Sequence, residues 1–88
     1  MNLYLLTQTE TVGYDTFDAM VVAAKSEDEA RKIHPYNNSS LRPDEDPWDE
    51  EPFFASWALT PEAVTVTLLG VAKRGTKAGI ILTSFNAG

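Results

Sequence analysis

The chain has 88 residues, a formal net charge of −6, 43% hydrophobic residues and no cysteine. This length and composition are typical of one globular domain with one thin core. The absence of cysteine excludes disulfides and thiolate metal sites, and the negative charge disfavours direct binding to nucleic acid or to an anionic membrane. We expect no signal peptide, because residues 2–9 are apolar but short and no basic region precedes them. We also expect no membrane span, because no apolar stretch approaches about 20 residues.

Two apolar segments near the start of the chain predict two strands. Residues 3–9 alternate after an apolar start, and residues 17–24 form a continuous apolar run, which is typical of a central strand. The segment between them contains Gly13 and suits a turn. We therefore expect these two strands to form a hairpin.

A capping box marks the start of one helix. Ser26 precedes Glu29 by three residues, so its hydroxyl can accept a hydrogen bond from the Glu29 amide. Basic residues such as Arg31 and His34 suit the negative end of the helix dipole, and Pro35 stops the helix. The pattern predicts a helix of about nine residues that must dock on a sheet to be stable.

The second half of the chain adds further strands. Residues 53–59 suggest a short edge strand, and Thr60 with Pro61 predicts a single helical turn. Residues 64–69 and 79–85 are apolar strand segments. We expect one α+β domain over residues 1–88, with an antiparallel sheet of about three to five strands and one short helix packed on one face.

An irregular acidic loop is predicted over residues 36–52, which contain three prolines. Such long loops in small domains are usually functional or disordered. Its centre carries six acids around one tryptophan: Asp44, Glu45, Asp46, Trp48, Asp49, Glu50 and Glu51. Two interpretations are open: a solvated loop, or a surface that mimics nucleic-acid phosphates and binds a basic protein. A cation site is disfavoured, because the ligand order of an EF-hand is absent.

Two roles are open to Trp48. Tryptophan is enriched among the residues that dominate binding interfaces, so Trp48 is a candidate anchor for a partner. It could equally fold back and pin the loop to the sheet. Trp57 lies in an apolar run and is expected in the core.

Other polar groups offer weaker candidates. Tyr14, Asp15 and Asp18 cluster near the first turn and form an alternative site for a small ligand or nucleotide, although turn capping also explains them. His34 is the single histidine and lacks a recognisable nucleophile motif beside it. A basic patch of opposite sign could pair with the acidic run internally or support head-to-tail association: Lys73, Arg74 and Lys77.

Four short segments carry a family resemblance. They are Tyr14-Asp15-Thr16-Phe17-Asp18, Val21-Val22-Ala23-Ala24, His34-Pro35 and Ser84-Phe85-Asn86-Ala87-Gly88. In this pattern the chain resembles small proteins encoded by bacteriophages and prophages. The resemblance covers both ends of the chain and leaves out the acidic middle. It implies expression in the cytoplasm of a host bacterium and a role among small acidic proteins that inhibit host defence or host enzymes.

The sequence thus favours a non-enzymatic protein that binds the basic surface of a host protein through the acidic loop. The alternatives are a small-ligand or nucleotide-binding module and a minor structural or accessory phage protein. We expect no catalytic residue, cofactor or metal, because no motif for any of them is present. Neither the identity of the partner nor the oligomeric state follows from the sequence.

Overall fold

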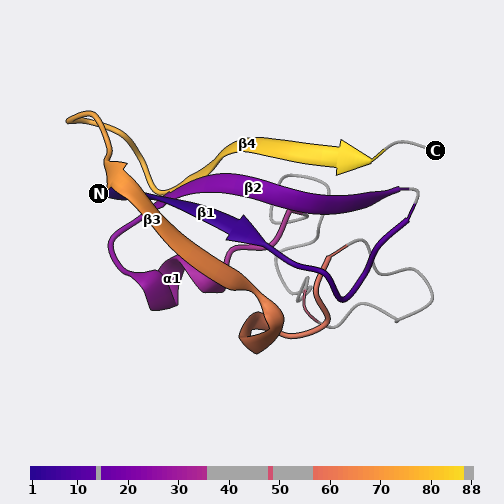
Figure 1. Cartoon of the computed structure of the whole chain (residues 1–88). Coiled ribbons are helices and arrows are strands. Elements are labelled where there is room, and N and C mark those ends of the chain that lie inside the picture. Colours follow the sequence, from indigo (N-terminus) through magenta and orange to yellow (C-terminus); the bar gives the residue numbers. More distant parts are fainter. Residues whose placement is uncertain (14, 36–47, 49–56, 87–88) are drawn as a thin grey trace.

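The computed structural model describes residues 1–13, 15–35, 48 and 57–86. Within them lies a four-stranded antiparallel sheet of order β3-β1-β2-β4. Its strands are β1 (Asn2–Thr7), β2 (Thr16–Ala24), β3 (Thr65–Val71) and β4 (Gly79–Asn86). Helix α1 (Glu27–Arg31) and the 3-10 helix η3 (Pro61–Ala63) lie on one side of the sheet (Figure 1). The predicted α+β architecture is confirmed.

The predicted hairpin forms the centre of the sheet. Strands β1 and β2 pair in register from Asn2 opposite Ala24 to Thr7 opposite Ala19. Strands β3 and β4 do not pair with each other but lie on opposite edges, and the connection between them protrudes beyond one end of the sheet (Figure 1). This connection contains a turn closed by the Thr76 amide on the Lys73 carbonyl, in which Gly75 has a φ of 92° that favours glycine.

Helix α1 is shorter than predicted. The Ser26 hydroxyl accepts from the Glu29 amide at 3.2 Å, as the capping box requires. The helix nevertheless ends at Arg31 after five residues, where the Ile33 amide bonds three residues back to Ala30. Pro35 also disfavours helical backbone at His34. The predicted helix of nine residues is therefore too long at its C-terminal end.

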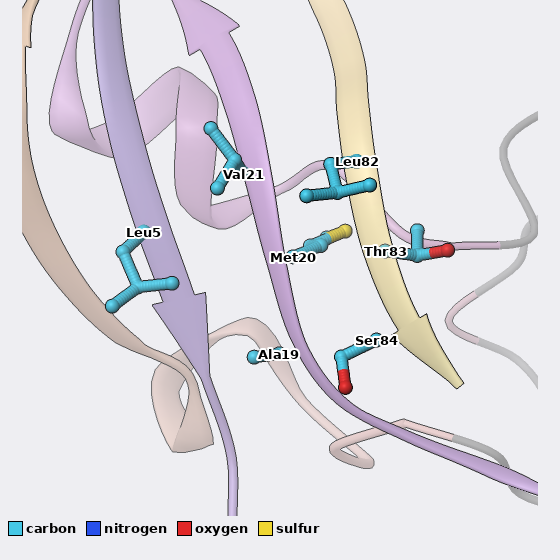
Figure 2. A pocket seen from close by; sticks show the side chains of 7 residues that line it. All are labelled: Leu5, Ala19, Met20, Val21, Leu82, Thr83 and Ser84. Carbon is cyan, nitrogen blue, oxygen red and sulfur yellow. The ribbon is translucent and has the colours of Figure 1, made fainter. Parts of the chain in front are cut away.

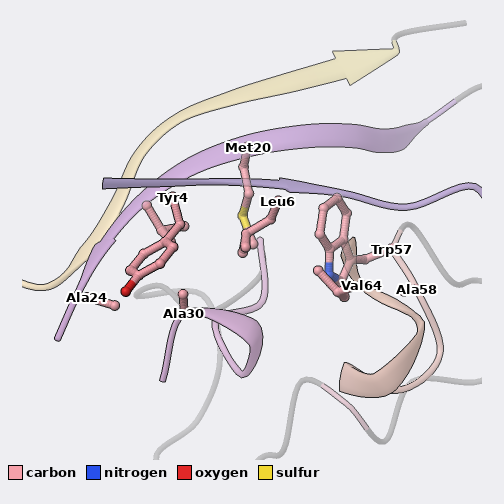
Figure 3. Packing of buried hydrophobic residues seen from close by; sticks show 9 residues of the cluster. Tyr4, Leu6, Met20, Ala24, Ala30, Trp57, Ala58 and Val64 are labelled. Carbon is pink, nitrogen blue, oxygen red and sulfur yellow. The ribbon is translucent and has the colours of Figure 1, made fainter. Parts of the chain in front are cut away.

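The face of the sheet toward α1, which we call the inner face, holds the core. A single cluster of apolar residues fills it (Figure 3): Tyr4, Leu6, Met20, Val22, Ala24, Ala30, Trp57, Ala58 and Val64. Trp57 is fully buried, as predicted. Among the residues that the structure describes, its indole Nε1 has no hydrogen-bond partner, a loss of about 1–3 kcal/mol. Burying the indole gains roughly 4–6 kcal/mol, so the net effect stabilises the fold.

Residues 57–64 follow the prediction only in part. Trp57, Ala58 and Leu59, the described end of the expected edge strand over 53–59, belong to no strand. The single helical turn after Thr60 is confirmed as η3. Arg31 holds this turn against α1, because its Nη1 donates to the carbonyls of Pro61 and Val64.

A buried glutamine organises the loop between β1 and β2. Gln8 is 4% exposed, and its Nε2 donates to the carbonyls of Thr11 at 2.6 Å and Phe17 at 2.8 Å. Its Oε1 accepts from the Thr11 amide at 2.8 Å. The side chain thus replaces the backbone partners that this loop lacks.

Replacing Gln8 with alanine should lower the free energy of unfolding by about 2–3 kcal/mol, because three hydrogen bonds of about 1 kcal/mol each are lost. Urea denaturation measures this change. Thr9→Ala is the control, since Thr9 is an exposed neighbour and should change stability by less than about 0.5 kcal/mol. Equal stability of the two variants would show that the Gln8 side chain contributes nothing.

Candidate functional site

Trp48 is the described member of the acidic segment, and it packs onto the body of the protein. Its side chain is half-buried and lies against the core cluster. The indole Nε1 donates to the Lys32 carbonyl at 2.9 Å. Lys32 is the C-cap of α1, and carbonyls at a helix end have no partner within the helix. Trp48 therefore ties its segment to the end of α1.

His34 forms the second contact of this anchor. The imidazole is 1% exposed, and its ring meets the Trp48 ring edge-on at a centroid distance of 4.9 Å. This geometry is favourable for aromatic pairs. The sequence suggested a histidine at the helix terminus beside the dipole. Instead, α1 ends three residues earlier and His34 is buried beneath the anchor.

One of the two roles left open for Trp48 is observed: the side chain folds back and packs on the protein. The other role, as an anchor for a partner, is not excluded by this packing. The six acidic neighbours of Trp48 at 44–46 and 49–51 lie outside the described residues, so partner binding by this segment stays a prediction.

The residues described at the first turn, which is the alternative ligand site, do not form a pocket. Tyr14 lies outside the described residues, and both Asp15 and Asp18 are exposed. Asp15 has a φ of 59°, and its amide donates to the Asn86 carbonyl at 2.6 Å. The backbone of Asp15 thus closes the turn against the end of β4. Ligand binding at Asp15 and Asp18 stays a prediction.

A shallow hollow lies on the other face of the sheet, which we call the outer face. It has a volume of about 210 Å³ and is lined by Leu5, Ala19, Met20, Val21, Leu82, Thr83 and Ser84 (Figure 2). The lining is apolar except for two hydroxyl-bearing side chains. No titratable group lines it, so the hollow is suited to apolar contact rather than to acid–base chemistry. Sequence analysis did not identify this feature.

The described part of the chain was compared with the requirements for a metal-ligand cluster and for a membrane-spanning helix. No group of three or more histidine, aspartate or glutamate side chains in residues 1–13, 15–35, 48 and 57–86 could hold a metal ion. Nor does any helix in these ranges have the length and hydropathy required to cross a bilayer.

Comparison with known proteins gives no family assignment. No protein-family model matches the chain, and neither the curated proteins nor the solved structures include a significant match.

Removing the Trp48 anchor should destabilise the protein in two separable steps. Trp48→Phe removes the bond to Lys32 and should lower the free energy of unfolding by about 1 kcal/mol. Trp48→Ala also removes a half-buried ring and should lower it by about 2–3 kcal/mol. Urea denaturation followed by circular dichroism measures both changes. A Trp48→Ala variant as stable as the native chain would show that the contact does not hold in solution.

Proposed function

We propose that this chain is a small acidic protein of phage type that acts in the cytoplasm of a host bacterium. It binds a host protein, which could belong to a defence system, and inhibits or modulates it. The binding element is the acidic segment around Trp48, and the partner presents a basic surface of the kind that normally receives nucleic acid. The action is stoichiometric binding and not catalysis.

The anchoring of Trp48 is the observation that carries this proposal. Three acids precede Trp48 within four residues and three follow it directly. The bond to Lys32 and the contact with His34 hold the middle of this run on the protein body. A charge cluster tethered at its centre has less conformational freedom to lose on binding than one tethered only at its ends. This arrangement suits recognition of a fixed basic surface.

The burial of His34 supports binding rather than catalysis. A histidine acting as general base must reach the proton it removes. The imidazole of this chain is buried and its ring packs against Trp48. Opposite charge on the partner would increase the association rate, because complementary potentials steer diffusional encounter.

Neutralising part of the acidic segment should slow association with the partner. The test first captures binding proteins from bacterial lysate on the immobilised chain and identifies them by mass spectrometry. The kinetics of the purified partner are then compared for the native chain and the triple variant Asp49→Asn, Glu50→Gln, Glu51→Gln. We expect the association rate of the triple variant to fall about tenfold at low salt, with little change in dissociation.

A matched control separates local from overall charge. The variant Glu27→Gln, Asp28→Asn, Glu62→Gln removes the same three charges from exposed positions on α1 and η3. It should associate at nearly the native rate. If both triple variants slow association equally, the association rate depends on the net charge of the protein and not on the acidic segment at Trp48. A rate that does not depend on salt would contradict the electrostatic proposal.

A further inference from the structure

The outer face of the sheet carries no charged residue at its paired positions. Register places these positions in three rows across β3, β1, β2 and β4. The ridge row contains Thr67, Leu5, Val21 and Leu82, and the small row contains Thr65, Thr7, Ala19 and Ser84. The third row contains Gly70, Leu3, Ala23 and Gly79. Solvated faces of antiparallel sheets normally carry polar residues that alternate with the core, so this uncharged face is unusual in a chain of net charge −6.

We propose that the outer face binds a second copy of this chain, so that two sheets pack face to face in a symmetric dimer. This interface is separate from the acidic segment. Leu82 lies in the middle row of this face, on the edge strand β4, and is 65% exposed in the single chain. An isologous dimer brings each surface against its own copy. An uncharged surface lets two molecules of charge −6 meet without placing like charges against each other, and a basic partner would find no acid in these rows to pair with.

The relief of the face selects one orientation. Leu5, Val21 and Leu82 form the ridge, and the hollow lies beside it over Ala19 and Ser84 (Figure 2). A two-fold axis between the two faces, parallel to the rows and midway between the ridge row and the small row, sets each ridge over the partner's small row. Side chains of packed sheets interdigitate in this manner at a spacing of about 10 Å.

The charges at the two ends of the sheet favour the same orientation. The exposed basic residues Lys73, Arg74 and Lys77 lie in the connection between β3 and β4 at one end. Asp15 and Asp18 are exposed near the start of β2 at the other end. The same two-fold rotation reverses the strand direction. It therefore brings the basic end of each copy toward the acidic end of its partner.

The size of the face allows a dimer of moderate affinity. Four strands spaced by about 4.8 Å, each with about seven residues of 3.3 Å, cover roughly 19 by 23 Å. Two such faces bury on the order of 900 Å² even without counting side-chain relief. Specific interfaces begin near about 1,000 Å². We therefore expect a dissociation constant on the order of 10 µM.

Sedimentation velocity of the full chain between about 1 µM and 500 µM tests the dimer, since this range brackets the expected dissociation constant. The native chain should shift from monomer to dimer. Leu82→Glu places a charge in the ridge row at an exposed position and should weaken the dimer at least tenfold. Val71→Glu is the matched control, because Val71 is 81% exposed on β3 but lies outside the three rows. It should leave the dimer unchanged.

Three results would overturn the proposal. One is that the native chain sediments as a monomer at every concentration, which would show that the outer face does not bind a second copy. Another is a dimer that survives Leu82→Glu with both variants folded by circular dichroism. The third is equal loss of the dimer in Val71→Glu, which would indicate pairing through the β3 edge.

Because the chain has no cysteine, cross-linking can test the orientation directly. Copies with Lys73→Cys should cross-link to copies with Asp18→Cys through a bismaleimide that spans roughly 20 Å, which covers the spacing of packed sheets and the offset of the two positions along the strands. Copies with Lys73→Cys alone should not cross-link to each other. The opposite result would place the basic ends together and overturn the reversed orientation.

Discussion

The shortness of α1 is the constraint on which the rest of this structure depends. Five residues of helix extend only about 7.5 Å, too little to cover the inner face of a four-stranded sheet. Irregular segments must therefore complete the cover. Trp57 supplies the largest fully buried side chain, and Trp48 adds a half-buried ring at the end of α1. Both tryptophans thus extend the cover of the inner face beyond the helix.

Hydrogen bonds from polar side chains fix backbone segments that make few contacts with the apolar core. Gln8 fixes the loop between β1 and β2, Arg31 joins α1 to η3, and the indole of Trp48 binds the end of α1. Each of them donates to backbone carbonyls that regular secondary structure leaves unpaired. In a domain of this size such bonds matter, because the apolar core is small. The loop between β1 and β2 and the turn η3 thereby acquire defined positions.

The molecule also separates its two kinds of binding surface. Trp48 lies at the end of α1, whereas the paired positions of the outer face of the sheet are uncharged. A charged surface contributes mainly to the rate of association, and an apolar face contributes mainly to the free energy gained on contact. If both surfaces act, the outer faces of the two sheets are joined in a dimer. Such a dimer carries two acidic segments. Two linked segments increase the effective affinity for a partner with two sites.

Local patterns in the sequence determined the four strands of the sheet, the start of α1 and the burial of Trp57, whereas the expected strand over 53–59 is wrong at its described end, residues 57–59. Alternation, the Ser26 cap and the Thr60-Pro61 signal act over a few residues, so they could be recognised without the fold. The sequence predicts a longer α1, because the bond from the Ile33 amide to the Ala30 carbonyl has no local signal. Both a partner anchor and a packed residue are compatible with the sequence at Trp48, and its contacts with Lys32 and His34 appear only when the chain folds.

Only the tertiary structure decided the strand order, the role of Gln8 and the uncharged outer face. A glutamine after a strand has no local signature of burial, and its three bonds arise only when the loop closes around it. The ridge on the outer face combines Leu5, Val21 and Leu82, one from each of three strands. Each is an ordinary strand residue in the sequence. Their alignment depends on register, and register is set by pairing between strands that are distant in the chain.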